Sequence, residues 1–121
     1  ESVLFTGFLT GADIDRAYKM ADVYVMPSVS EPFGITPLEA MRNGTPVIIS
    51  KQSGVSEVVT HALKVDFWDV HEMANKILGV LHYKDLQEEL GLQGSREVHK
   101  MSWDNPAKKV LGLYAQLQKR R

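Results

Sequence analysis

Short apolar runs rich in β-branched residues alternate with segments of helical periodicity along most of the chain. Apolar runs of four to eight residues favour strands, whereas apolar positions three and four residues apart favour helices. The pattern predicts strands at 3–8, 23–26, 47–49 and 63–67. It predicts helices at 10–20, 36–43, 54–59, 69–82, 85–100 and from 105 onward. Strands and helices therefore alternate in the first part of the chain, and helices alone follow.

Residues that favour helix ends support this division. Thr10 and Asp69 stand where an N-cap side chain accepts a hydrogen bond from a free backbone amide. Residues 36–39 have the form of a capping box, with Thr36 as N-cap and Glu39 at the third helical position. The helix that begins there is therefore predicted to start at Thr36.

Alternating strands and helices at this spacing are typical of βαβ units, which form parallel sheets through right-handed crossovers. Three consecutive apolar β-branched residues at 47–49 indicate a strand that is buried on both faces. We therefore predict the α/β class, with a doubly wound parallel sheet and a helical C-terminal extension. Within that extension, Gly91 and Gly94 are expected to weaken the helix at 85–100.

Composition limits the classes of function. The 121 residues suit one domain, and a formal net charge of -1 provides no basic field that attracts nucleic acid or an anionic membrane. No apolar run approaches the length of about 20 residues that spans a membrane. The lack of cysteine excludes disulfides and is compatible with a reducing compartment. Because the chain starts at Glu1 without an initiator methionine, we expect residues 1–121 to be a single partial domain of a longer protein.

Two loops stand where a parallel sheet holds its ligands. Such sheets bind ligands at the carboxyl ends of their strands, which here are followed by residues 27–36 and 50–54. Gly34 lets the backbone come close to a ligand, and the amides of Ile35 and Thr36 lie where a helix begins. Free amides and the positive end of a helix together bind anions, and a diphosphate suits them.

Each charged residue of these loops has a structural alternative. Glu39 is on local grounds as readily a helix cap as a ligand contact, and Glu31 has the alternative of a solvated loop acid. Lys51 could approach a phosphate, although a solvated loop lysine is the more common case. The spacing of Glu31 and Glu39 does not support hydrolysis, because the two carboxylates of a glycosidase must flank one anomeric carbon.

No metal site is expected from the sequence. Asp13, Asp15 and Asp22 do not form a persuasive metal cluster, and the four histidines are dispersed. His71 lacks the second histidine that a zinc-protease helix requires. Trp103 is interpreted as a hydrophobic anchor for the last helix rather than as a platform that stacks on a sugar.

Five ordered sequence elements carry a specific resemblance. They are residues 21–28 (ADVYVMPS), 31–34 (EPFG), 38–41 (LEAM), 44–48 (GTPVI) and 54–59 (GVSEVV). Within them, Glu31 and Glu39 are two glutamates separated by seven residues. The stretch closely resembles the donor-binding half of retaining glycosyltransferases of the GT-B fold, in glycosyltransferase family 4, the group related to glycogen synthases. A weaker likeness extends over nearly the whole chain.

The resemblance implies a Rossmann-like domain and a transferase that moves a sugar from a nucleotide donor with retention of configuration, with no cofactor and no required metal. Carried over by position, it implies that Glu31 is the catalytic residue, in contact with donor-sugar hydroxyls at the reaction centre. Gly34, Ile35 and Thr36 are implied to offer backbone amides to the sugar and the diphosphate. Glu39 is implied to accept hydrogen bonds from the ribose, a role that competes with capping.

The chain also departs from the family pattern. The basic pair that usually neutralises the diphosphate and the N-terminal acceptor-binding domain would precede Val3, and this sequence does not contain them. The turn before the strand at 63–67 lacks the glycines that family members often have there. We therefore expect the isolated chain to be inactive as a transferase. Its sheet is expected to close by direct pairing of 3–8 with 23–26, or by dimerisation.

Several functions stay open on the sequence alone. The leading interpretation is the nucleotide-sugar-binding half of a hexosyltransferase that acts in polysaccharide or glycoconjugate biosynthesis. The alternatives are a non-catalytic nucleotide- or protein-binding module on the same scaffold, and a nucleotide-sugar epimerase of the same fold. We expect a cytoplasmic protein, and peripheral association of the full-length form with a membrane stays open.

Overall fold

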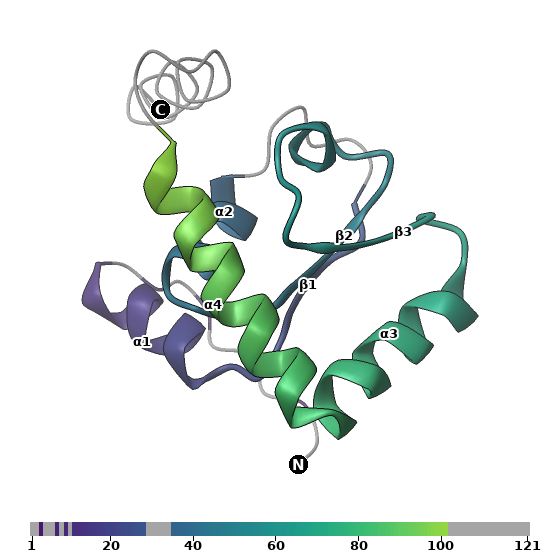
Figure 1. Cartoon of the computed structure of the whole chain (residues 1–121), viewed down its shortest axis with the longest axis horizontal. Coiled ribbons are helices and arrows are strands. Elements are labelled where there is room, and N and C mark those ends of the chain that lie inside the picture. The colour runs from purple at the N-terminus through teal and green to yellow at the C-terminus, as the bar shows by residue number, and fades with distance from the viewer. Residues whose placement is uncertain (1–2, 4–6, 8, 10, 29–34, 102–121) are drawn as a thin grey trace.

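The computed structural model describes residues 3, 7, 9, 11–28 and 35–101. Strands and helices alternate up to residue 82, and one further helix follows (Figure 1). In chain order, the elements are α1 (Ala12–Met20), β1 (Tyr24–Met26), α2 (Ile35–Arg42), β2 (Val47–Ser50), the 3-10 helix η1 (Gly54–Glu57), β3 (Leu63–Val65), α3 (Val70–His82) and α4 (Lys84–Lys100).

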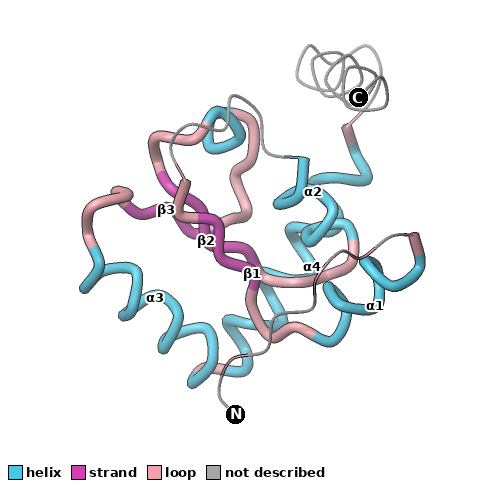
Figure 2. Tube along the Cα trace, turned by 180° about the vertical axis from the view of Figure 1, so that it is seen from behind, coloured by secondary structure: helices cyan, strands magenta, loops and turns pink. Residues whose placement is uncertain are grey.

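The three described strands form one parallel sheet in the order β1-β2-β3 (Figure 2). Tyr24 pairs with Val47, and Ile48 pairs with Leu63. Each strand is joined to the next by a connection that contains a helix, as parallel pairing requires. The prediction of an α/β fold with a parallel sheet and C-terminal helices is confirmed.

The sheet has an apolar cluster on each face. One cluster joins Met26 and Ile49 of the sheet to Leu38 and Met41 of α2. The other joins Ile48 of β2 and Val65 of β3 to Val80 of α3. All four residues of β2 are buried, so the expectation that this strand is covered on both faces is confirmed.

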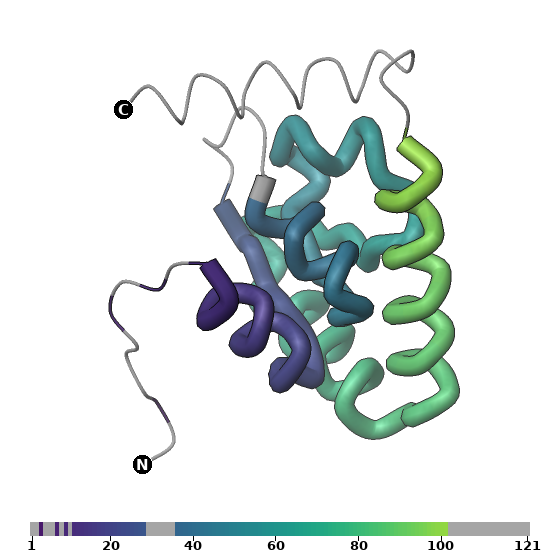
Figure 3. Tube along the Cα trace, turned by 90° about the vertical axis from the view of Figure 1, so that its left-hand side faces the viewer, coloured from purple at the N-terminus to yellow at the C-terminus, as the bar shows by residue number. Residues whose placement is uncertain are grey.

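Two helices beside the sheet fix the position of α2. In Figure 3, α1 and α4 lie along the two sides of α2, and both helices contact it. Thr45, in the turn after α2, donates a hydrogen bond from Oγ1 to the carbonyl of Tyr18 in α1 at 2.5 Å. The position of α2 relative to β1 is therefore held from both sides as well as through the core.

The predictions for the N-terminal segment concern a strand at 3–8 and the start of α1. Val3 and Gly7 lie in no strand, and residues 4–6 and 8 are outside the described part, so the predicted pairing of 3–8 with 23–26 is not decided. Gly11, not Thr10, is the N-cap of α1, with a φ of 56°. The prediction of Thr10 as N-cap is therefore wrong, because the chain turns into this helix through a left-handed backbone that glycine adopts without strain.

The start of α2 also differs from the prediction. This helix begins at Ile35, so Thr36 is already a helical residue and not the N-cap. Among the described residues, the carboxylate of Glu39 makes no hydrogen bond to the amide of Thr36. The capping-box interpretation of residues 36–39 is therefore wrong. The helix predicted at 54–59 is present as the shorter η1.

The two long helices near the C-terminus agree with their predicted ranges. Asp69 caps α3 as predicted, because its Oδ1 accepts a hydrogen bond from the amide of Glu72 at 2.9 Å. Gly91 and Gly94 are buried inside α4, where they serve close packing instead of merely weakening the helix. The helix predicted from 105 and Trp103 lie outside the described residues. Among the helices of the described part, none combines the length and the apolar character needed to cross a membrane.

Candidate donor site at the carboxyl edge of the sheet

The predicted site residues fall on the connection between β1 and α2. Glu31 and Gly34 lie outside the described residues. Ile35 and Thr36 are the first two residues of α2, and Glu39 follows one turn later. Since the first amides of a helix have no partner within it, α2 presents its positive end on the side where β1 ends. This part of the predicted site is compatible with an anion.

A tyrosine of the sheet holds the hydroxyl of Thr36. Tyr24, the first residue of β1, donates a hydrogen bond from its phenol to Oγ1 of Thr36 at 2.8 Å. The amide of Tyr24 in turn donates to the carbonyl of Pro46 at 2.8 Å, which ties the residue to β2. Thr36 is exposed to solvent at the start of α2. The contact joins the sheet directly to the first turn of this helix.

Glu39 has an unusual environment for a surface helix residue. Its side chain is half-buried, and its carboxylate accepts no hydrogen bond from the described residues. Burial raises the pKa of Glu39; Arg42 opposes this effect and Asp15 adds to it. A carboxylate that is partly removed from water usually accepts hydrogen bonds from donor groups of the protein. The acceptor capacity of this carboxylate is therefore unused within the described part of the protein.

Tyr18 of α1 borders the same carboxylate. Burial raises the pKa of Tyr18 to about 12, and the charge of Glu39 adds to the effect. The ring of Tyr18 meets the ring of Tyr24 edge to face, with centroids 5.7 Å apart. Tyr18, Tyr24, Thr36 and Glu39 thus form a chain of neighbours between α1, β1 and α2, which we call the α1–α2 cluster.

Ser28 adds a second unused polar atom at the carboxyl end of β1. Its Oγ is buried and has no hydrogen-bond partner in the described part of the chain. An unpartnered buried hydroxyl calls for an explanation, because it loses its bonds to water without replacing them. Ser28 lies in the loop that the sequence selected for ligand binding, and Glu39 follows that loop in α2.

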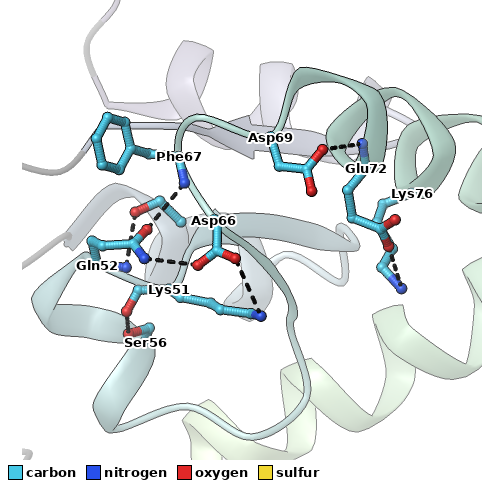
Figure 4. A network of polar contacts seen from close by, with 9 residues as sticks. Lys51, Gln52, Ser56, Asp66, Phe67, Asp69, Glu72 and Lys76 are labelled. Atoms are coloured by element: carbon cyan, nitrogen blue, oxygen red, sulfur yellow. Dashed lines mark hydrogen bonds and ion pairs between the residues drawn. The ribbon is translucent and has the colours of Figure 1, made fainter.

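The second predicted loop, residues 50–54, is occupied by its own contacts (Figure 4). Lys51 forms an exposed ion pair with Asp66, with 3.8 Å between Nζ and Oδ2. Gln52 donates from Nε2 to Asp66 and accepts from the amide of Phe67. These contacts fasten the end of β2 to the end of β3. Lys51 therefore has an ion-pair partner within the chain.

A surface pocket of about 420 Å³ lies at the opposite edge of the sheet. Asp22 and Pro46, which line it, precede β1 and β2, and the other wall comes from α4. Parallel α/β sheets bind ligands at the carboxyl ends of their strands, not at the amino ends. This pocket is therefore separate from the predicted donor site.

The α1–α2 cluster contains two residues that the sequence did not single out, Tyr18 and Tyr24. Tyr24 lies in an apolar strand, where a buried tyrosine ring usually finds a partner for its hydroxyl. That rule could have indicated a polar contact at this position, although not its partner. Nothing in the sequence indicated a polar contact for Tyr18, because its position fits the periodicity of the helix predicted at 10–20. In the described part of the chain, no group of three or more histidine or acidic side chains could hold a metal ion.

Comparison with known proteins finds a matching family and similar proteins. Residues 1–97 match the family described as glycosyl transferases group 1. An uncharacterized glycosyltransferase of Methanocaldococcus jannaschii is 38% identical over 117 residues, which cover 93% of this chain and 30% of that protein. The sulfoquinovosyl transferase of Arabidopsis thaliana is 33% identical over 113 residues, covering 88% of this chain and 22% of that protein.

A solved structure is similar as well. The sucrose-phosphate synthase of Thermosynechococcus elongatus superposes with a TM-score of 0.68 and 35% sequence identity, covering 87% of this chain and 27% of that one. The chain thus spans less than a third of the length of each of these relatives.

Proposed function

This chain belongs to the group 1 glycosyl transferases, and from that premise we propose that it binds the nucleoside diphosphate part of a sugar donor. The site is the carboxyl edge of the sheet, between β1 and α2. The observation that carries the proposal is the carboxylate of Glu39, which is half-buried and has no hydrogen-bond donor among the described residues.

A ribose satisfies this carboxylate. Its two vicinal hydroxyls each donate one hydrogen bond, and a carboxylate has two oxygens to accept them. Hydrogen bonds to a charged acceptor contribute on the order of 1.5–3 kcal/mol, which repays the desolvation that raises the pKa of Glu39. A cap role does not account for the carboxylate, because α2 begins at Ile35, before the position that a capping box requires.

The start of α2 suits the diphosphate. The amides of Ile35 and Thr36 belong to the first turn, where the helix dipole favours negative charge. When the glycosyl bond breaks, the departing nucleoside diphosphate gains negative charge. A fixed helix start stabilises that charge without rearranging. Ribose at Glu39 and diphosphate at Thr36 place the donor along α2, with the sugar at its N-terminal end.

We further propose that the complete enzyme transfers a hexose with retention of configuration and without a required metal, as the resemblance of residues 21–59 implies. In this proposal Glu31 contacts the donor sugar, and Gly34 adds a backbone amide. Residues 1–121 form part of the donor-binding domain, and a separate domain binds the acceptor. The short share of each relative that this chain spans supports a larger enzyme.

Binding of nucleoside diphosphates by Glu39→Gln tests the proposal. UDP, ADP and GDP are titrated calorimetrically into the wild-type protein, and the best of them into the variant. Glutamine keeps the size of the side chain and removes its charge. Affinity is expected to fall roughly ten- to a hundredfold.

Glu88→Gln is the matched control. Glu88 is exposed on α4 at the opposite edge of the sheet. The Glu88→Gln variant should therefore bind the nucleoside diphosphate with the same affinity as the wild type. Thermal melts of both variants exclude unfolding as the cause. Unchanged affinity of Glu39→Gln for the nucleotide would contradict the ribose role.

A further inference from the structure

We propose that Tyr24 is a positioning residue for the diphosphate: by donating to Oγ1 of Thr36, its phenol leaves the hydroxyl hydrogen of Thr36 to point at a phosphate oxygen. This inference rests on the proposed function and adds a side-chain donor to the backbone amides of α2.

The inference follows from the hydrogen bonds that the hydroxyl of Thr36 can make. A threonine hydroxyl has one hydrogen to donate and two lone pairs that accept. The phenol of Tyr24 uses one lone pair, at 2.8 Å. A phenol is a stronger acid than an aliphatic alcohol, so it is the better donor of the two. Thr36 itself donates to none of the described residues.

Thr36 is exposed in the first turn of α2, at the end of the helix where negative charge is favoured. An acceptor that approaches from solvent can therefore reach its hydroxyl hydrogen.

Tyr24 is held firmly enough to fix this direction. It belongs to β1, its amide is bonded to Pro46, and its ring packs edge to face on Tyr18 with an interplanar angle of 77°. Because a donor on a rigid element does not have to be ordered when ligand binds, it costs little conformational entropy. A hydroxyl that accepts one hydrogen bond is also polarised to donate a stronger one.

The chemistry points to phosphate oxygens rather than to ribose or base. Phosphate oxygens only accept, so a lone outward hydrogen suits them, whereas ribose hydroxyls need an acceptor such as Glu39. In this proposal α2 recognises the two ends of the nucleotide in opposite ways: Thr36 donates to the phosphate, and Glu39 accepts from the ribose. Removing the Tyr24 phenol should weaken binding of the diphosphate and leave binding of the bare nucleoside unchanged.

The experiment is a double-mutant cycle with Tyr24→Phe and Thr36→Val. Calorimetry measures affinity for the best-bound of UDP, ADP and GDP and for its nucleoside. Tyr24→Phe keeps the ring on Tyr18 and is expected to lower diphosphate affinity about three- to tenfold. Thr36→Val should lower it at least as much. The double variant should be no weaker than Thr36→Val alone, because the phenol acts through that hydroxyl.

Two further variants separate positioning from structure. Thr36→Ser keeps the hydroxyl and should retain near wild-type diphosphate affinity. Tyr83→Phe removes a phenol from an exposed ring between α3 and α4 and should change nothing. Nucleoside affinity serves as the internal reference, since general damage to the fold would lower it together with diphosphate affinity.

The outcomes are distinct. The inference would be overturned if Tyr24→Phe bound the diphosphate as tightly as the wild type does. It would also be overturned if the two losses of affinity added up in the double variant. Either result would leave the proposed function intact. Failure of the wild-type protein to bind any of the three diphosphates would instead overturn the proposed function. If Tyr24→Phe does not fold, the comparison of Thr36→Ser with Thr36→Val decides, because equal affinities would overturn the donor role of the hydroxyl.

Discussion

Gly91 of α4 lies against the backbone carbonyl of Gly44 so closely that a β-carbon on Gly91 would overlap the carbonyl oxygen. Gly44 follows α2 and turns the chain toward β2, with a φ of 81°. The contact therefore brings α4 against the end of the helix that carries the α1–α2 cluster. Backbone cannot move aside as a flexible side chain does, so this approach requires glycine.

Gly91→Ala is expected to destabilise the protein by roughly 1–3 kcal/mol, because the new methyl group must push α4 away from the Gly44 turn. Gly79→Ala is the matched control, since a β-carbon there would meet no atom within 4 Å. That change is expected to stabilise α3 by about 0.5–1 kcal/mol. Denaturant unfolding of both variants measures the difference, and equal stability of the two would contradict the packing role.

Glu97 joins α4 to the turn before β3. Its carboxylate accepts hydrogen bonds from the amides of Thr60 and His61, at 2.6 and 2.7 Å. Glu97→Ala leaves both amides without this acceptor and is expected to cost about 1–3 kcal/mol. Hydrogen exchange should lose protection at Thr60 and His61. Glu88→Ala, on the exposed side of α4, should change neither quantity, and unchanged exchange in Glu97→Ala would refute the prediction.

The sequence predicted the elements that depend on local periodicity. The run at 47–49 indicated a doubly buried strand, and Asp69 indicated a helix start, because each depends on residues that are neighbours in the chain. The contact of Gly91 with Gly44 joins distant segments, so its glycine was interpreted only as a weak helix former. The start of α2 was placed one residue late for the same reason: the hydroxyl of Thr36 bonds to Tyr24 of the sheet instead of capping its own helix.

The candidate site was predictable as a segment rather than as an arrangement. Strand order and the sequence motifs selected the residues after β1, and Glu39 among them. That its carboxylate would lie beside Tyr18, half-buried and without a donor in the described part of the chain, depends on how α1 packs against α2. No periodicity in one helix determines the angle at which another helix meets it.

Tyr18 should make the protein sensitive to alkali. Its pKa is raised to about 12 by burial and by Glu39, from an ordinary value of 10.0. The unfolded chain therefore loses this proton first, so the stability linked to Tyr18 is intact below about pH 10 and is lost as pH rises toward about 12. Unfolding free energies over this window should fall less steeply for Tyr18→Phe than for the wild type.

Glu39→Gln offers a second test of the same coupling. It removes a negative charge that disfavours the ionised phenol, so the pKa of Tyr18 should decrease. Ultraviolet absorbance of the phenolate measures this change, with the Tyr18→Phe spectrum subtracted. An unchanged titration curve would show that Glu39 and Tyr18 are not electrostatically coupled.

The raised pKa of Glu39 predicts opposite effects of pH on stability and on binding. Burial disfavours the charged carboxylate in the folded protein. Its linked contribution to stability is therefore present below the unfolded pKa and lost as pH rises through the folded value. Glu39→Gln should thus melt at an equal or higher temperature than the wild type at neutral pH.

Binding changes in the other direction, because the ribose hydroxyls need the ionised acceptor. Nucleoside affinity of the wild type should fall as pH decreases through the raised pKa of Glu39, and Glu39→Gln should give a flat, weak profile. A nucleoside without phosphate is used so that no phosphate titrates in the same range. Calorimetric titrations from neutral to mildly acidic pH measure both profiles. A flat wild-type profile would contradict the ribose role of Glu39, since an acceptor that loses its charge cannot keep the same affinity for two hydroxyl donors.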